Sequence, residues 1–395
     1  MKRATLVILI VLLVLVTAGA TFAGTVHWME TQYEHAVPVL SKLQEVSDLI
    51  DRYYIGETDP EAMITAAADG AAAGLVEATG DRWSYYLSAE ESAAYMEQLY
   101  NTYVGIGVTI REAEEGMEIV SVTAGGPAEE AGILPGDVCI AVEGRSTKEL
   151  GMEATKELVR GEEGTTVQMT FLRDGEQLEL TVERRSIVYD VATYTLLGEN
   201  IGLIHISNFD EHCAEQTMAC IQQAMEDGAQ SLIFDLRFNG GGLKKEMVAI
   251  LDHLLPEGEI FREVDYAGRE DVLYSDAAHL DLPMVVLVNE DSYSAAEFFA
   301  ACLQEYGAAK IVGMPTTGKG RYQYNLTLSD NSVLVISAGE YFTPSGQSLA
   351  ETGVQPDEQV DLSDEAYYLL YYGTLAHEED PQLQAAVDLL SEKVS

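Results

Sequence analysis

The chain has 395 residues, of which 47% are hydrophobic, and a formal net charge of −44. This length suggests two or three domains with sizeable apolar cores. A chain so acidic repels phosphate backbones and is only weakly attracted to anionic membrane surfaces, which excludes nucleic acid as an expected partner.

The N-terminus predicts a membrane anchor. Lys2 and Arg3 precede the uncharged run ATLVILIVLLVLVTAGATFAG, which is long enough to cross a bilayer. Basic residues before such a run hold the N-terminus in the cytoplasm. We therefore expect residues 1–24 to form a single-pass anchor in the cell membrane, with the rest of the chain extracytoplasmic. The alternative is a cleaved signal peptide, because AGATFAG contains small residues suited to cleavage.

Residues 25–100 predict a helical region. Asp59 is followed by a proline, which is favoured at the first position of a helix. Ser88 and Glu91 have the spacing of a capping box. We expect these helices to pack either on the core or on a second copy of the chain, so a homodimer is one expected assembly.

The four cysteines indicate buried thiols rather than disulfides. Cys213 and Cys220 lie seven positions apart on one expected helix, about 10 Å along its axis. That exceeds the reach of a disulfide, roughly 7 Å between Cα atoms. Cys139 and Cys302 lie in apolar runs. No CxxC, HExxH or histidine cluster occurs, so neither a metal nor another cofactor is predicted.

Residues 101–186 predict a small β-rich module, because short alternating runs are separated by glycine-bearing turns. The segment GPAEEAGILPGD adds a short helix and a tight turn. Successive N–H groups around Gly105 and Gly107 are suited to holding a terminal carboxylate. An extended peptide would then add as a strand to the module's edge. The alternative is a glycine-rich turn that leads into a first strand.

Strands alternate with helices in residues 187–362, which predicts an α/β layered fold. The expected strands are residues 201–209, 231–237, 283–288 and 309–313, and the expected helices are residues 211–228, 243–255 and one that begins at Ser294. Residues 363–395 are expected to form a C-terminal helical segment.

Ser294 lies between an apolar run that ends at Val288 and a helical pattern that ends near Gly307. With Glu297 it has the capping-box spacing, which is a purely structural interpretation. A hydroxyl at this corner also lies beside the N–H dipoles of a helix N-terminus, where a nucleophile and an oxyanion site can share space. These residues alone leave both interpretations open.

Two further segments follow expected strands. In DLRFNGGGL, residues 235–243, the glycines either permit close backbone approach or form an ordinary turn. In GMPTTGKGRYQ, residues 313–323, Lys319 is flanked by glycines without the spacing of a P-loop. None of the seven histidines is an obvious base for Ser294. A lysine can replace histidine if burial lowers its pKa from about 10.4, and Gln323 would hold it without adding charge.

Taken together, these segments resemble the C-terminal processing peptidases, the tail-specific serine proteases of family S41. Ser294, Lys319 after 25 residues and Gln323 after four more fall on the spacing of the family's serine, lysine and assisting glutamine. The resemblance runs from about Leu43 to the C-terminus. One departure is EDSYSAAE, where the family often has GSASASE.

The glycine-rich segment is similar to the family's DLRxNxGG motif, although the family usually has proline where Gly240 stands. The resemblance implies an oxyanion hole made by the N–H groups of Ala295 and of either Gly241 or Gly242. The segment YFTPSGQSLAETGVQPD, residues 341–357, is similar to the family's YxTPxG…G(I/V)xPD motif.

The same resemblance implies a crotonase/ClpP-like α/β core with an inserted PDZ domain. The carboxylate-binding loop would be Tyr103–Val108, with the peptide held at Gly105, Ile106, Gly107 and Val108. The expected activity is a Ser–Lys endopeptidase that selects protein or peptide substrates by their exposed C-terminal tails. One rival is a non-catalytic, membrane-tethered PDZ scaffold. The other is a crotonase-like acyl-CoA enzyme, which needs cationic residues in a chain with only 22 lysines and arginines.

Overall fold

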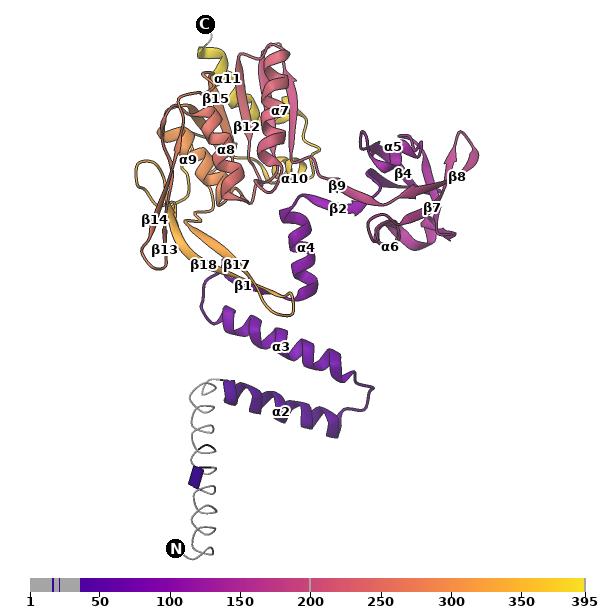
Figure 1. Cartoon of the computed structure of the whole chain (residues 1–395). Coiled ribbons are helices and arrows are strands. Elements are labelled where there is room, and N and C mark those ends of the chain that lie inside the picture. Colours follow the sequence, from indigo (N-terminus) through magenta and orange to yellow (C-terminus); the bar gives the residue numbers. More distant parts are fainter. Residues whose placement is uncertain (1–15, 18–20, 22–35, 199, 394–395) are drawn as a thin grey trace, which may run out of the picture.

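The computed structural model describes residues 16–17, 21, 36–198 and 200–393 (Figure 1). The expected anchor, residues 1–24, lies almost wholly outside these ranges. Among the helices in the described ranges, none combines the length and the apolar character that spanning a bilayer requires.

The α/β core is built on a six-stranded sheet with the order β10-β11-β12-β15-β16-β19. Only β10 is antiparallel to its neighbour. The two central strands are buried along their whole length, as their continuous apolar runs predict. The strands are β10 (Ala192–Leu197), β11 (Ile201–Ile206), β12 (Ser231–Asp235), β15 (Met284–Val288), β16 (Ala309–Gly313) and β19 (Glu358–Gln359).

Helices cover both faces of this sheet. On one face, alternate residues of β12 and β15 pack on α7 (Cys213–Glu226), α8 (Lys244–Leu254) and α9 (Ala295–Glu305). On the other face, the remaining residues of these strands pack on α11 (Pro381–Lys393). This arrangement confirms the expected α/β layers and brings the carboxyl ends of β12, β15 and β16 to one edge.

A second sheet was not anticipated from the sequence. Its strands are β1 (Tyr85–Leu87), β13 (Gly258–Asp265), β14 (Glu270–Ser275), β17 (Arg321–Thr327) and β18 (Val333–Phe342). The expectation that residues 25–100 are entirely helical is therefore wrong at β1. This strand pairs with β18, about 250 positions later, and no local periodicity reveals such a pairing.

The β-rich module has its own sheet and its own apolar core. The sheet order is β3-β4-β5-β7-β8, with β6 (Arg145–Ser146) paired to β5. These strands are β3 (Val108–Ala113), β4 (Gly116–Val122), β5 (Val138–Val142), β7 (Thr166–Arg173) and β8 (Glu176–Glu183), and the helices are α5 (Pro127–Glu130) and α6 (Thr147–Val159). Figure 1 shows the module set apart from the core and joined to it through a two-stranded ribbon of β2 (Thr102–Gly105) and β9 (Arg185–Val188).

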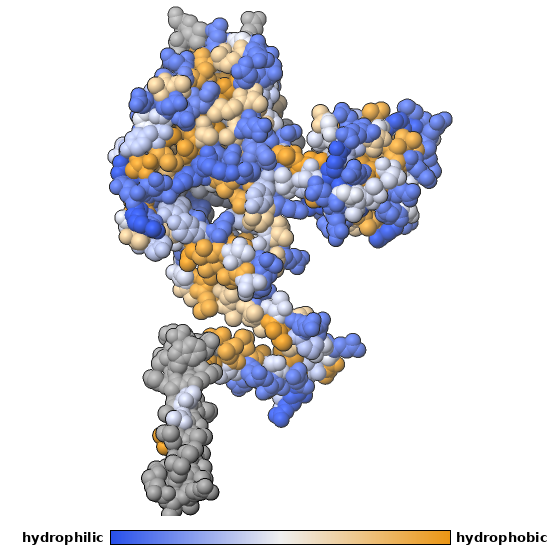
Figure 2. All heavy atoms as spheres, in the orientation of Figure 1, coloured by the Kyte–Doolittle hydropathy of each residue, from blue (hydrophilic) through white to orange (hydrophobic). Residues whose placement is uncertain are grey.

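The N-terminal helices project from the rest of the molecule (Figure 1). They are α2 (Ala36–Tyr53), α3 (Pro60–Glu77) and α4 (Ala89–Leu99), and the expected caps at Asp59 and Ser88 are formed. None of the residues of α3 is buried. Figure 2 shows apolar surface on the hairpin formed by α2 and α3. The exposed large apolar side chains of this hairpin include Val37, Leu40, Leu49, Ile64 and Leu75.

All four cysteines are free thiols, as predicted. Cys139, Cys213 and Cys302 are buried, but Cys220 is only partly buried, so the expectation of a buried thiol is wrong for Cys220. Burial raises the pKa of the Cys139 and Cys213 thiols to about 12. These thiols are therefore uncharged at neutral pH. The C-terminal segment contains α10 (Asp364–Tyr371) and the short helix η1 (His377–Glu379) before α11.

Candidate active site

Ser294 occupies a strained corner between β15 and α9. Its φ is 61°, a conformation that costs about 1–3 kcal/mol for a residue with a side chain. The corner is tied to the end of β12, because the Ser292 hydroxyl donates to Leu236 O at 2.8 Å. Nine of the eleven residues of α9 are buried, so the helix behind Ser294 is firmly anchored. Strain at an exposed-looking polar corner is typical of a functional position.

Lys319 lies on the neighbouring loop, between β16 and β17. It is only 9% exposed, and its ammonium lies 4.7 Å from the ring centroid of Trp83 and 5.8 Å from that of Tyr293. Burial lowers the pKa of Lys319 from 10.5 to about 8, although the carboxylates of Glu297 and Asp81 oppose this shift. A substantial fraction of the amine is therefore neutral in mildly alkaline solution and able to accept a proton.

Glu297 joins these two loops. Its side chain is fully buried, and its Oε2 accepts hydrogen bonds of 2.9 Å from the backbone N–H groups of both Ser294 and Lys319. Since both nitrogens contact one oxygen, they are no more than about 6 Å apart. Its Oε1 accepts from Gly318 N at 2.6 Å and from the Thr316 hydroxyl at 2.5 Å. Burial raises the pKa of Glu297, and these four hydrogen bonds offset part of that effect.

The capping interpretation of Glu297 is therefore correct but incomplete. The carboxylate does accept the N–H of Ser294 at the start of α9. It also fixes Gly318 and Lys319, more than twenty positions later, relative to Ser294. The sequence carried a signal for the first role only, because the second depends on how β16 lies beside β15.

The glycine-rich loop after β12 approaches Ser294 closely. A Cβ at Gly241 would lie 2.7 Å from Ser294 Cβ and 2.9 Å from Ala295 N. A Cβ at Gly242 would lie 2.4 Å from the backbone of Phe209. Both positions therefore require glycine: a side chain at 241 would clash with Ser294, and one at 242 would clash with the backbone of Phe209.

The backbone N–H groups of Gly241, Gly242 and Ala295 differ in whether they already have an acceptor. Gly241 N donates to the side chain of Asn239 at 2.8 Å. The N–H groups of Ala295 and Gly242 donate to no other group in the described part of the chain. Of the two glycines left open by the sequence, Gly242 thus has the unoccupied donor.

A buried ion-pair network holds the start of this loop. Arg237 is 3% exposed and contacts Asp235 at 2.6 Å and Asp380 at 2.8 Å. Burial alone would raise the pKa of Asp235, but the charge of Arg237 holds it below its ordinary value. The network fastens the loop to the N-terminus of α11. The sequence analysis predicts no role for Arg237 or Asp380, although Arg237 belongs to the DLR motif.

Gln323 does not accompany Lys319 in this structure. Its amide donates to Arg321 O at 3.1 Å, and it makes no hydrogen bond to Lys319 in the described chain. The groups that do surround the lysine are Trp83 and Tyr293, together with Tyr341, whose hydroxyl donates to Lys319 O. No local pattern indicates Trp83, because it precedes Ser294 by more than 200 positions.

Comparison with known proteins decides the family. Residues 200–360 match the profile of peptidase family S41, and residues 104–183 match that of the PDZ domain. The chain is 30% identical over 367 residues to a probable CtpA-like serine protease of Staphylococcus saprophyticus, which covers 91% of this chain and 74% of the relative. The chain belongs to peptidase family S41.

Other S41 proteins agree with this assignment. The carboxy-terminal processing protease CtpA of Bacillus subtilis is 30% identical over 328 residues, which cover 82% of this chain and 70% of that protein. A solved structure described as an S41 protease of Bacteroides fragilis has a TM-score of 0.50 at 20% identity, covering 86% of this chain and 91% of that one, and supports the fold alone. The chain is thus a serine-type peptidase with a PDZ domain.

The expected carboxylate loop of the PDZ domain lies between β2 and β3. Gly107 has φ 75°, which favours glycine, and Ile106 is buried in the core of the domain. Two carbonyls of the loop bond inward, Ile106 O with Ala128 N and Gly107 O with Thr123 N, each at 2.9 Å. These bonds fix the shape of the four predicted binding positions, Gly105, Ile106, Gly107 and Val108.

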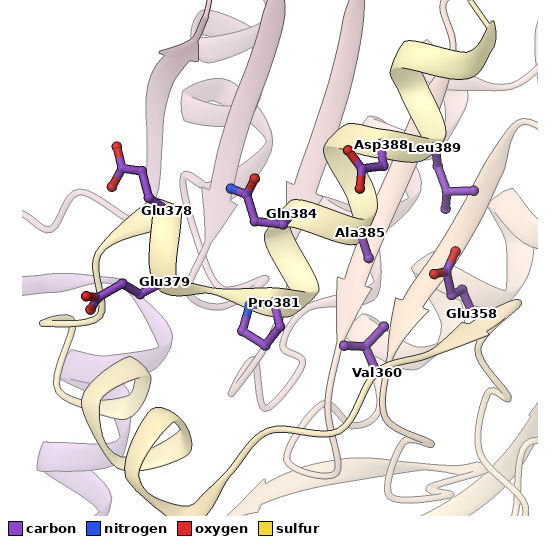
Figure 3. A pocket seen from close by; sticks show the side chains of 9 residues that line it. All are labelled: Glu358, Val360, Glu378, Glu379, Pro381, Gln384, Ala385, Asp388 and Leu389. Atoms are coloured by element: carbon purple, nitrogen blue, oxygen red, sulfur yellow. The ribbon is translucent and has the colours of Figure 1, made fainter.

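A hollow in the described part of the chain lies away from these sites. It is a groove of about 810 Å³ between β19, η1 and α11, and four of its nine lining residues are acidic, as Figure 3 shows. None of the predicted catalytic residues lines it. Ser294 and Lys319 instead lie on loops at the edge of the core sheet.

Proposed function

We propose that Ser294 and Lys319 form the catalytic dyad of an S41 endopeptidase. The observation that carries this proposal is the shared carboxylate of Glu297, which fixes the backbone of both residues at one place. The burial of Lys319, which lowers its pKa to about 8, supports its role as the base. The approach of Gly241 to Ser294 supports an oxyanion hole beside them.

In the proposed reaction, the Ser294 hydroxyl gives its proton to the neutral amine of Lys319. Its oxygen attacks the scissile carbonyl carbon, and the carbonyl oxygen becomes an oxyanion held by the N–H groups of Ala295 and Gly242. The Lys319 ammonium then protonates the leaving amine as the peptide bond breaks. Water, deprotonated by the same amine, releases the acyl group and restores the serine.

In the unliganded structure, the dyad is not closed. The ammonium of Lys319 faces the rings of Trp83 and Tyr293 and makes no hydrogen bond to Ser294 in the described chain. Catalytic hydrogen bonds often form only when substrate binds. We infer that an extended substrate brings the amine and the hydroxyl together.

The proposal also includes the substrates of the enzyme and its location in the cell. The PDZ domain selects proteins or peptides by their C-terminal tails, which agrees with the name of the relative from Bacillus subtilis. The N-terminal segment anchors the enzyme in the membrane, with its catalytic core extracytoplasmic. The exposed apolar side chains of α2 and α3 favour a homodimer through this hairpin. No cofactor takes part.

Active-site titration tests the dyad. A serine-reactive phosphonate should label the wild type stoichiometrically, label Lys319→Ala about 10²–10⁴-fold more slowly, and leave Ser294→Ala unlabelled. Cleavage of an unstructured, tail-bearing substrate is measured on the same samples. Unchanged cleavage by Ser294→Ala would contradict the dyad. If no form cleaves but all bind tails, the chain is a PDZ scaffold instead.

A further inference from the structure

Phe238 has an unusual backbone for an aromatic residue. It lies in the loop between β12 and α8, and its φ is 64°. Bulky side chains rarely adopt this left-handed conformation, which costs about 1–3 kcal/mol. Such a conformation persists only when the surroundings impose it. Phe238 precedes Gly241 by three positions, so its backbone sets the course of the loop beside Ser294.

Two tyrosines of α10 hold the ring of Phe238. The ring centroids of Tyr367 and Tyr371 lie 5.1 and 5.4 Å from that of Phe238, and both contacts are edge-on, at 75° and 79°. Each such contact is worth about 0.5–1.5 kcal/mol, so the pair is comparable with the backbone strain. The N–H of Phe238 also donates to the side chain of Asn289 at 2.9 Å.

Helix α10 contacts the serine loop as well. The Tyr367 hydroxyl donates to the carboxylate of Asp291, which precedes Ser294 by three positions. The helix has no buried residue of its own. The two tyrosine side chains contact Phe238 in one loop and Asp291 in the other, so α10 reaches both the glycine-rich loop and the loop of Ser294.

We propose that α10 positions the oxyanion loop of this peptidase. The rings of Tyr367 and Tyr371 hold Phe238 at positive φ, and this directs the following glycines toward Ser294. Both tyrosines act through Phe238 and are positioning residues. Without them, Phe238 relaxes to negative φ, the next peptide turns, and the loop withdraws from the serine. This inference rests on the proposed oxyanion role of the loop.

The test is the double variant Tyr367→Ala/Tyr371→Ala, assayed on a short peptide without a recognition tail. We expect kcat per titrated site to fall at least tenfold with KM unchanged, because an oxyanion hole acts only in the transition state. Tyr368→Ala is the matched control, since Tyr368 is as exposed as Tyr371 but packs on Tyr372. The conservative variant Tyr367→Phe keeps the ring and should keep most of the activity.

Rescue separates positioning from general stability. Glycine adopts positive φ without strain, so Phe238→Gly should make kcat insensitive to loss of the two tyrosines. Because kcat is calculated per titrated active site, a loss of folded protein cannot produce the expected fall in kcat. The single variant Tyr371→Ala is a milder change that tests the same contact. Unchanged kcat in the double variant, or an equal fall in the glycine background, contradicts this inference alone. A wild type that fails to cleave contradicts the proposed function and this inference with it.

Discussion

The protease core and the PDZ domain each present a glycine-rich loop, but the surroundings of the two loops differ. Around the core loop lie buried ionisable groups: Glu297, Lys319 and Arg237 are all at most 9% exposed. Around the PDZ loop lies an apolar cluster that includes Ile106, Met117 and Phe171. Burying a charged group costs free energy unless the group has a hydrogen-bond or ion-pair partner. The surroundings of the core loop therefore carry a free-energy cost that the apolar surroundings of the PDZ loop do not.

The proposed roles of the two loops account for this difference. Transferring a proton from a hydroxyl requires an amine whose pKa has been lowered, and burial is the means of lowering it. Holding a terminal carboxylate requires only N–H groups in a fixed arrangement. Changes in the core should therefore alter kcat, and changes in the PDZ loop should alter KM for tailed substrates alone. The predictions below test that division.

The largest effect is expected at Glu297. In Glu297→Gln, one carboxylate oxygen becomes an NH2 group, which cannot accept hydrogen bonds. The variant therefore loses either the two bonds from the N–H groups of Ser294 and Lys319 or the two from Gly318 N–H and the Thr316 hydroxyl. An unsatisfied buried group costs about 1–3 kcal/mol, and both loops depend on this side chain. We expect kcat on a tail-less peptide to fall at least 100-fold. Glu340→Gln, at a half-exposed carboxylate, is the control and should have no effect. A kcat within threefold of wild type for Glu297→Gln would show that the two loops keep their positions without the Glu297 carboxylate.

The pH dependence comes next. The base is active when Lys319 is neutral, so activity should be low at acidic pH and rise through the pKa of about 8. Below that pH, kcat/KM should increase about tenfold per pH unit, and it should level off above it. The measurement is the kcat/KM of the tail-less peptide from pH 6 to 10. A profile that is flat across this range would exclude a lysine base.

The free energy of unfolding should also depend on the protonation of Lys319. The pKa of Lys319 is lower in the folded chain, about 8, than in the unfolded chain, where lysine titrates near 10.4. The unfolded state therefore binds more protons between these values, so stability rises with pH across that window. Lys319→Met should be more stable than wild type below pH 8, by at most about 3 kcal/mol, and this advantage should shrink as pH approaches 10.4. Urea unfolding at pH 7 and pH 10 measures it.

Much of the core could be predicted because its signals are local. The buried strands β12 and β15 are continuous apolar runs, and α9 repeats at helical spacing. Ser294 and Lys319 follow strand ends, where parallel strands bring loops to one edge. The glycine-rich motif predicts close backbone approach, and both Gly241 and Gly242 lie in such close contacts.

The remaining features depend on contacts between distant segments. The pairing of β1 with β18 brings the N-terminal region, and with it Trp83, toward Lys319. The second role of Glu297 likewise depends on tertiary structure. Gln323 was expected beside Lys319 only because the resemblance implies it, and its position depends on how β17 pairs with β18, where the register shifts between Tyr322 and Gln323.

Trp83 covers the Lys319 ammonium and so affects the pKa of Lys319. Its ring lies over the Lys319 ammonium, and Trp83→Ala would admit water there. Loss of the cation–π contact would lower the pKa of Lys319, but burial is the largest influence on that pKa, so rehydration should prevail and raise it. We expect the rise in kcat/KM to move to higher pH, with about tenfold less activity at pH 7 for a pKa higher by one. Tyr266→Ala, at a residue 78% exposed, should leave the profile in place. Movement to lower pH would mean that the ring contact dominates.

The smallest effect is expected in the PDZ loop, and it should appear only with tailed substrates. A methyl group at Gly107 would meet Thr123 at 3.1 Å and strain a backbone with φ 75°, so Gly107→Ala should distort the carboxylate loop. KM for a tail-bearing substrate should rise about fivefold to tenfold, a loss of about 1–1.4 kcal/mol, with kcat unchanged. The matched control is Gly125→Ala, which has φ 67° in the same domain but no atom within 4 Å of the added methyl group. If Gly107→Ala instead lowers kcat on the tail-less peptide, the PDZ loop and the core are coupled, and the division between recognition and chemistry does not hold.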